Sequence, residues 1–457
     1  MSRTFDVIVV GGGFAGLSAA VRAATRGARV LVVEARPRLG GRATAFPDRE
    51  TGELVDNGQH VLLGCYRSTL AFLADIGALE RVRVQPQLAV TTIDLAGVRT
   101  RLVCPPLPAP LHLLAGIIDW DGIGCRDKLA ALRMATPLRL AQREARGEAV
   151  AAASPGETVD AWLVRNGQTA RLRDMLWHPL ALAALNQPAD VAAAPVFARV
   201  LAEMFAPKAA TGPEPAAIVL PATSLNQMYA EPAQAFLAAR GSETRTGAAA
   251  RLIIEDGRAV GVDLNGARIL AGAVIAAVPW FAFSALVDPV PAALAPTVSN
   301  ARLMAASPIV SVNLWLDRPV LDDAFVGLPG RTMQWVFDAG ITTGGRASHL
   351  SLVSSGAESL LARTNQALVA LAHEELVGAL PAAGAARLLR AAVVREPRAT
   401  FSLAPGQPPR PSAATLIDGL FLAGDWTDTG LPATIESAVR SGYRAADLAS
   451  AAHGQFG

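Results

Sequence analysis

The most regular hydrophobic pattern lies near the start of the chain. An apolar run over residues 5–10 leads into three glycines at 11–13, then a helical stretch, and a second apolar run over residues 30–33 ends at Glu34. Short apolar runs bounded by glycine predict buried strands of a parallel sheet. A terminal acid can accept a hydrogen bond from a ribose 2′-OH. The segment therefore predicts a strand–helix–strand unit that binds a dinucleotide.

The residues of this first turn have distinct physical roles. Gly11 permits a tight turn, Gly13 lets backbone N–H groups approach a pyrophosphate, and Gly16 allows close helix packing. Phe14 and Ala15 lie in the first helical turn, where unpaired N–H groups and the positive end of the helix dipole favour phosphate. The turn is therefore expected to hold a pyrophosphate.

Related patterns recur in the middle and at the end of the chain. Residues 249–264 predict a hairpin around an Asp-Gly turn, residues 420–425 a strand ending in Gly-Asp, and a helix is expected to begin near Thr434. One nucleotide domain is thus predicted from three pieces, with a substrate domain between them. The predicted boundaries are 1–70, 215–290 and 401–457 for the nucleotide domain, and 71–214 and 291–400 for the substrate domain.

Composition excludes several classes of protein. The 41 basic residues nearly balance 39 acidic ones, so no basic surface is expected for nucleic acid. The three cysteines have no C-x-x-C spacing, and the six histidines lack metal-ligand spacing, so no metal site is predicted. A strand beginning at Phe5 leaves no room for a signal peptide, which predicts a cytoplasmic location.

Two apolar stretches raise the question of membrane contact. Residues 271–287 fall short of the ~20 residues that a spanning helix needs, and they predict a buried strand followed by a helix start. Residues 107–120 permit two interpretations. If exposed, they would dip into the inner face of a bacterial membrane, with Trp120 at the interface. If buried, they are simply core, which is the favoured interpretation.

Three motifs carry a resemblance to a known family. The stretches V-V-G-G-G-F-A-G-L, V-V-E-A-R-P-R-L-G-G-R and F-L-A-G-D-W-T-D-T-G-L-P-A-T-I-E-S-A-V-R-S-G resemble the FAD-dependent amine oxidase and carotenoid desaturase superfamily. Residues 56–66, 177–186 and 197–201 are similar to the bacterial hydroxysqualene dehydroxylases within it. The resemblance implies an α/β fold: a glutathione-reductase-type, doubly wound FAD-binding domain, interrupted by a mixed α+β, amine oxidase-like substrate domain.

The resemblance also implies how FAD is held. The Gly-Asp strand end would approach the pyrophosphate and ribityl chain, the backbone at residue 249 would meet the adenine, and the helix beginning near residue 434 would face the flavin pyrimidine edge. The implied FAD-contacting residues are Gly11, Gly13, Phe14, Ala15, Gly16, Glu34, Ala35, Arg36, Gly41, Arg42, Ala249, Gly424, Asp425, Thr434 and Ile435.

The residue types that are missing from the C-terminal region limit the class of substrate. Amine oxidases of this fold surround a cation with aromatic rings, but Trp426 is the only aromatic residue between Gly424 and Thr434, and no lysine follows Lys208. A long isoprenoid suits the apolar insert better. The resemblance implies reductive removal of the hydroxyl of hydroxysqualene, giving squalene. With only one dinucleotide fingerprint in the chain, an external electron donor is expected to reduce the flavin.

Loss of hydroxide requires an acid that protonates the departing oxygen. Asp56 and His60 are the candidates, since in related folds their segment passes by the flavin ring; the alternative is a polar turn that only orders the loop. Glu203 could face the substrate, but a solvated helix acid is favoured. The candidate linings of the substrate pocket are Trp120, Trp177, Trp280, Trp315 and Trp335.

Two rival functions stay open. A carotenoid-type desaturase would use the same parts in reverse, to oxidise a polyene. The fold also hosts non-catalytic prenyl-binding escort proteins, which need not hold a flavin.

Overall fold

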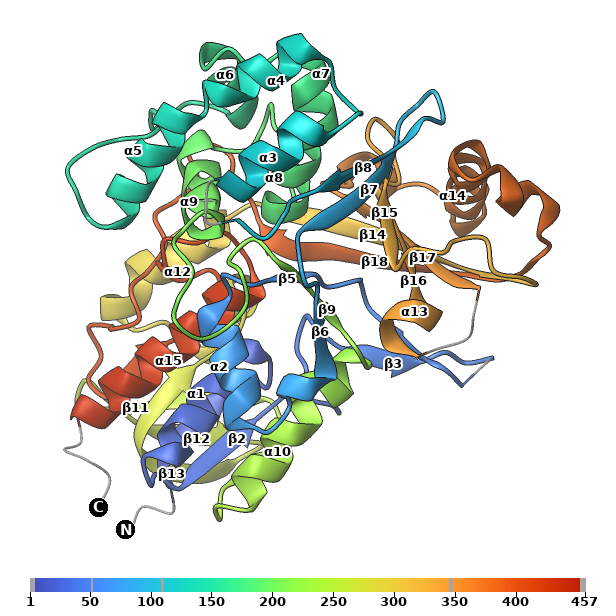
Figure 1. Ribbon diagram of the computed structural model, residues 1–457. Helices are drawn as coiled ribbons and strands as arrows, with labels where there is room; N and C mark the ends of the chain where they lie inside the picture. The colour runs from blue at the N-terminus through green and yellow to red at the C-terminus, as the bar shows by residue number, and fades with distance from the viewer. Residues whose placement is uncertain (1–4, 51, 108–110, 345–347, 453–457) are drawn as a thin grey trace.

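The computed structural model describes residues 5–50, 52–107, 111–344 and 348–452, which form two large sheets and a helical lobe (Figure 1). The first sheet has the order β10-β2-β1-β13-β12-β11, and β19 pairs with β13. All its pairings are parallel except those of β12 with β11 and β13. Its strands are β1 (Phe5–Val10), β2 (Val30–Val33), β10 (Glu243–Arg245), β11 (Ala250–Glu255), β12 (Arg258–Leu264), β13 (Ala267–Ala276) and β19 (Leu420–Leu422).

The first sheet is buried on both faces, which explains its apolar strands. Successive side chains of a strand point to opposite faces. Accordingly, Val7 and Val9 pack into the core beneath helices α1 (Phe14–Thr25), α10 (Glu231–Ala238) and α15 (Ile435–Ala452). Ile8 and Val10 join a second core with residues of β12 and of α11 (Trp280–Leu286). The predicted hairpin and parallel strands are confirmed.

The second sheet has the order β18-β14-β17-β16-β15-β7-β8. Helix α14 (Asn365–Ala379) packs against β14 and β18, and its apolar residues share a core with that face of the sheet. The other face carries the aromatic side chains of Phe325, Trp335 and Phe337. The strands are β7 (Ala89–Ile93), β8 (Arg99–Val103), β14 (Ala306–Leu316), β15 (Phe325–Gly327), β16 (Trp335–Asp338), β17 (His349–Ser355) and β18 (Leu388–Phe401).

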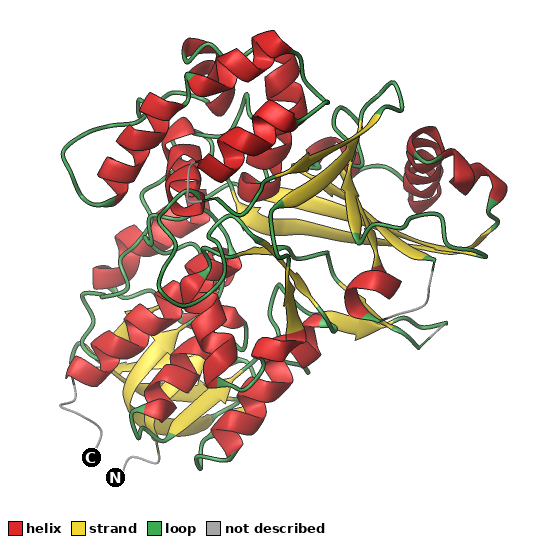
Figure 2. Cartoon of the chain, in the orientation of Figure 1, coloured by secondary structure: helices red, strands yellow, loops and turns green. Residues whose placement is uncertain are grey.

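Helices gather in a lobe beside this sheet, whereas the strands of the two large sheets form two separate groups (Figure 2). The lobe contains α3 (Leu111–Asp119), α4 (Cys125–Leu132), α5 (Ala135–Ala145), α6 (Val159–Arg165), α7 (Ala170–Leu172), α8 (His178–Leu185) and α9 (Ala194–Met204). Two small sheets connect the large ones: β3-β4 (Ala45–Pro47, Leu54–Asp56) and β5-β9-β6 (Leu62–Leu63, Ile218–Pro221, Val82–Val84).

Two predicted domain boundaries cut through packed helices. Helix α2 (Arg67–Asp75) crosses the boundary at 70/71, yet it packs against α15 and α1 of the first domain. The boundary at 290/291 separates α11 from α12 (Ala295–Leu303), which pack together. Local sequence pattern does not report such contacts between helices, and the division of the chain into domains stays a prediction.

The apolar segment 107–120 has a buried side and an exposed side, and residues 108–110 of it lie outside the described residues. Leu113, Ile117 and Trp120 are buried, and the Trp120 indole Nε1 donates to Thr100 Oγ1 at 3.2 Å. The core interpretation of Trp120 is therefore confirmed. Within the part of the chain that the structure describes, no helix has both the length and the apolar character needed to cross a membrane.

Candidate active site

The turn after β1 is built from glycines that leave no room for side chains. Gly11 has φ +113°, and a Cβ there would lie 2.5 Å from the Ala277 carbonyl oxygen. A Cβ on Gly16 would lie 1.8 Å from the carbonyl oxygen of Gly11. Helix α1 can therefore approach the turn only with glycine at both positions.

A second glycine pair faces this turn across a narrow gap. Gly41 has φ +57°, and a Cβ there would lie 3.0 Å from the Cα of Gly13. Helix α1 begins with no side-chain cap and with no acid in its first turn, formed by Phe14 and Ala15. Its first N–H groups thus have no competing carboxylate, as phosphate binding requires. We call Gly11, Gly13, Gly16 and Gly41 the glycine cradle.

Glu34 ties the end of β2 to this cradle. Its carboxylate accepts from Gly12 N through Oε2 and from Arg36 N through Oε1, each at 2.8 Å. The middle piece of the chain lies against the same acid, because Ala248 N donates to Glu34 O at 3.0 Å. Ala249 follows at the surface, and Ala35 lies between Glu34 and Arg36. The structure thus brings together the residues expected around the adenosine.

The C-terminal piece closes the other side of the cradle. Gly424 has φ +143°, and a Cβ there would lie 2.7 Å from the Trp426 ring. Its N–H donates to Ser441 Oγ on α15 at 2.8 Å. The Asp425 carboxylate is buried and pairs with Arg42. The segments around Arg42 and Asp425, which lie far apart in the sequence, are therefore joined at one site, as expected for residues along a single extended cofactor.

Helix α15 begins at this same site. Thr434 Oγ1 accepts from Ser437 N at 3.2 Å, so Thr434 caps the helix that Ile435 begins. A helix start offers N–H donors and a positive dipole end to an electron-rich edge. Together with the uncapped start of α1 and the close approach of Gly13 and Gly41, which only glycine permits, this arrangement fits FAD.

A largely apolar cavity lies between the second sheet, the helical lobe and the start of α15. Its volume is about 270 Å³, counting only the space that the centre of a water molecule can reach. Three of the five candidate tryptophans line it, namely Trp120, Trp177 and Trp335. Trp280 instead lies beneath the Arg42 guanidinium, and Trp315 stacks on His349, so neither is in its wall.

Asp56 and His60 are not among the residues that line this cavity. Along their segment, Gln59, Val61 and Leu63 face it, whereas His60 and the buried Leu62 occupy the alternate positions. Side chains of an extended segment alternate between two faces, so a shift of one residue selects the opposite set. The catalytic assignment of Asp56 and His60 stays a prediction.

Both candidates have perturbed acidity. Burial raises the pKa of Asp56 to about 7, although its Oδ1 accepts from Leu225 N at 3.0 Å, which acts in the opposite direction. Burial lowers the pKa of His60, whose Nδ1 lies 2.7 Å from Gly58 O. At neutral pH Asp56 is thus close to half protonated, whereas the His60 ring is neutral.

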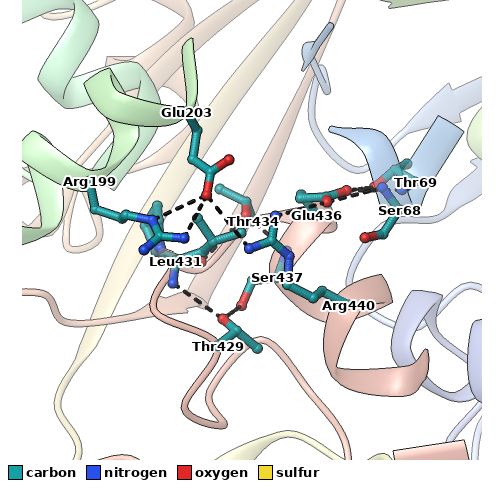
Figure 3. Close-up of polar contacts among 11 residues, drawn as sticks. Ser68, Thr69, Arg199, Glu203, Thr429, Leu431, Thr434, Glu436, Ser437 and Arg440 are labelled. Carbon is teal, nitrogen blue, oxygen red and sulfur yellow. Dashed lines mark hydrogen bonds and ion pairs between the residues drawn. The ribbon is translucent and has the colours of Figure 1, made fainter. Parts of the chain in front are cut away.

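Three charged side chains lie in the cavity wall, namely Glu203, Glu436 and Arg440, and the sequence did not single out the last two (Figure 3). Arg199 on α9 donates to Glu203 Oε1 from Nε at 3.1 Å and from Nη2 at 2.7 Å. Arg440 on α15 lies 3.6 Å from the same oxygen and 3.4 Å from Glu436 Oε1. We call these four residues the Glu203 cluster. The expectation of a solvated helix acid at Glu203 is wrong.

Glu436 has a structural role in this cluster. The side chain is 2% exposed, and it accepts from Ser68 N at 3.1 Å and from Thr69 N and Oγ1 at 2.9 Å each. These donors lie at the start of α2, so Glu436 satisfies free N–H groups of that helix. Tyr66 and Cys65 line the cavity next to it, and burial raises the pKa of both side chains.

Comparison with known proteins agrees with this geometry. Residues 14–449 match the model of the flavin containing amine oxidoreductase family. The chain is 34% identical to the hydroxysqualene dehydroxylase of Rhodopseudomonas palustris, over 99% of each chain. It is 25% identical to the 15-cis-phytoene desaturase of Arabidopsis thaliana, over 96% of this chain and 79% of that protein.

Solved structures show the same fold. An oxidoreductase from Methanosarcina mazei superimposes with a TM-score of 0.73 at 16% identity, covering 97% of this chain and 100% of that chain. The predicted fold class and the FAD cofactor are therefore confirmed. The chain belongs to the flavin containing amine oxidoreductase family, and within it to the hydroxysqualene dehydroxylases.

Proposed function

We propose that this protein removes the hydroxyl group of hydroxysqualene and releases squalene. One observation carries the proposal: the largely apolar cavity extends to the start of α15 at Thr434, where FAD is expected to present its ring. A cavity walled by Trp, Leu and Ala suits a long hydrocarbon. The 34% identity to a hydroxysqualene dehydroxylase supports this substrate.

The reaction breaks one C–O bond and forms one C–H bond. The oxygen leaves as water after gaining a proton, and the carbon gains a hydride, so two electrons and two protons are consumed in all. FAD, when bound and reduced, supplies the hydride. The electrons come from an external donor, since the chain has one dinucleotide fingerprint.

The residues of the chain orient both partners. We expect the glycine cradle to hold the pyrophosphate, and Glu34 to hold the ribose beside Gly12. The N–H groups at Ile435 then face the ring edge that gains negative charge on reduction. The largely apolar wall excludes water, which would otherwise intercept a cationic carbon centre.

Asp56 or His60 is the proton donor that we propose from the sequence. The raised pKa of Asp56 supports its role, since a group close to half protonated at neutral pH can act as an acid. Replacing Asp56 by Asn, or His60 by Gln, is expected to abolish squalene formation while FAD stays bound. Full turnover in both variants would rule out the assignment.

The function is tested by supplying dithionite-reduced enzyme with hydroxysqualene and oxidised enzyme with phytoene, without oxygen. We expect squalene from the first mixture and no desaturated product from the second. The opposite result would favour the carotenoid-type desaturase. A purified protein that lacks the flavin absorbance band near ~450 nm and cannot be reconstituted would favour an escort protein.

We further propose that the protein rests on an anionic membrane surface through α3 and α4, which lie side by side at the end of the molecule away from the first sheet (Figure 1). Leu111 and Ile118 on α3 are 53% and 58% exposed, and Leu129 on α4 is 67% exposed. Arg126 and Arg133 lie on the same face of α4 as Leu129, one turn to either side.

Apolar side chains flanked by arginine suit a bilayer with anionic headgroups. Leu113 and Trp120 of the same segment line the cavity, so lipid would enter there.

Replacement of Leu129 by Asp should reduce co-sedimentation with phosphatidylglycerol vesicles several-fold. Leu416, 82% exposed and distant along the chain, provides the matched control, L416D. Equal loss in both variants would contradict this placement.

A further inference from the structure

The two carboxylates in the cavity wall, Glu436 and Glu203, differ in how many of their oxygens have a partner. Glu436 uses both carboxylate oxygens, on Ser68, Thr69 and Arg440. Glu203 uses only Oε1, which accepts from Arg199 and lies beside Arg440. Within the described residues, Glu203 Oε2 has no hydrogen-bond partner. In Figure 3 this oxygen points away from both arginines.

Such a wall is poorly matched to a pure hydrocarbon. The Glu203 side chain is 24% exposed and Arg440 32%, so both are partly screened from bulk water already. A hydrocarbon filling the cavity would remove the remaining water from Oε2 and leave a charged acceptor without a donor, which is costly. A hydroxylated lipid avoids this cost because its O–H can donate to the carboxylate.

The Glu203 cluster lies beside the place where the flavin ring is expected. Glu436 and Arg440 belong to the first turns of α15, whose start at Thr434 is expected to face the flavin. Arg440 lies 3.6 Å from the other oxygen of Glu203, Oε1, so the two arginines hold one side of the carboxylate and leave Oε2 as the acceptor for an alcohol O–H. The wall therefore offers a charged acceptor to a hydroxyl group.

We propose that Glu203, held by Arg199 and Arg440, is the specificity-determining residue that binds the substrate hydroxyl. This inference rests on the proposed function and adds a consequence to it. The product lacks the hydroxyl, so the same carboxylate that retains hydroxysqualene favours release of squalene. Sites built to hydrogen-bond a hydroxyl discriminate strongly against the analogue that lacks it.

The test compares equilibrium binding of hydroxysqualene and of squalene to the FAD-loaded enzyme in detergent micelles, with no electron donor present. Wild type is expected to prefer hydroxysqualene. E203L should lower this preference at least about tenfold, the size expected for loss of a charged hydrogen bond, with squalene binding unchanged or tighter. E203Q, which keeps the shape of the side chain, should lower it less.

Glu157 provides a matched control. It pairs with Arg165 at 2.7 Å outside the cavity, and E157L should leave the lipid preference unchanged. If E203L prefers hydroxysqualene over squalene as strongly as wild type does, the proposal is overturned. If E203L does not fold, an unchanged preference in E203Q overturns it equally. Wild type that forms no squalene refutes the proposed function instead, whereas wild type that forms squalene but binds both lipids equally refutes only this inference.

Discussion

The glycine cradle and the apolar cavity meet at α15, yet they are built on opposite principles. In the cradle the backbone forms the site, and one added atom would disrupt it, because a Cβ on Gly16 would lie 1.8 Å from the Gly11 carbonyl oxygen. In the cavity, side chains from the second sheet, the lobe and α15 make the wall, and many apolar residues would serve equally. Sites defined by backbone geometry therefore tolerate less change than sites defined by volume.

The largest expected effect comes from the cradle. Gly16→Ala forces the Gly11 carbonyl to move, so we expect purified protein with at least tenfold less bound flavin, measured by its absorbance. Gly378 in α14 provides the matched control, because a Cβ there meets nothing within 4 Å. Gly378→Ala should keep full flavin content, with stability equal or higher by about 0.5–1 kcal/mol. Equal flavin content in both variants would remove the contrast between the two regions.

The next effect concerns Asp56, on β4 between the two regions. Its folded-state pKa is about 7 against an ordinary value of 3.8, so between these values the folded state holds a proton that the unfolded chain has lost. Stability therefore falls as pH rises from about 4 to about 7. Asp56→Asn removes this loss, so the stability of the variant should rise relative to that of wild type by on the order of 4 kcal/mol across this pH window.

Guanidinium unfolding midpoints at pH 4.5 and 8 would measure this gain for Asp56→Asn. The control is Glu80→Gln, because the Glu80 side chain is 72% exposed. A difference from wild type that does not depend on pH would show that the Asp56 carboxyl is solvated.

The smallest effect is expected in the cavity. Ala184 on α8 lines it, and Ala184→Phe places a ring in the lipid volume. We expect KM for hydroxysqualene to rise about tenfold, the loss of roughly one buried side chain's worth of contact, with flavin content unchanged. Ala367→Phe at an exposed position of α14 is the control. An unchanged KM in Ala184→Phe would place the substrate elsewhere.

The same contrast explains what the sequence could reveal. The turn at Gly11, the acid at Glu34 and the strand ending in Gly424 could be predicted, because local backbone geometry restricts the residue type at each. Their assembly into one domain followed from the strand pattern. The roles of individual residues toward FAD stay predictions.

The cavity wall was harder to predict. Glu203 forms an i,i+4 pair with Arg199, a pattern typical of solvated helix surfaces. Its second partner, Arg440, comes from α15, and one sequence cannot show that contact. For His60, the sequence did hold a usable signal. Gln59, Val61 and Leu63 occupy alternate positions of one segment and face the cavity, so His60 between them faces the other way.

The close contact between α1 and α15 has a consequence for how the chain is made. A Cβ on Gly442 would lie 2.3 Å from Ala15 O, and the Ser18 hydroxyl donates to Val439 O across 421 positions of sequence. Helix α1 therefore leaves the ribosome long before α15, the helix that it packs against. Such long-range closure is slow. During synthesis we expect the apolar face of α1 to need shielding by a chaperone until α15 has been made.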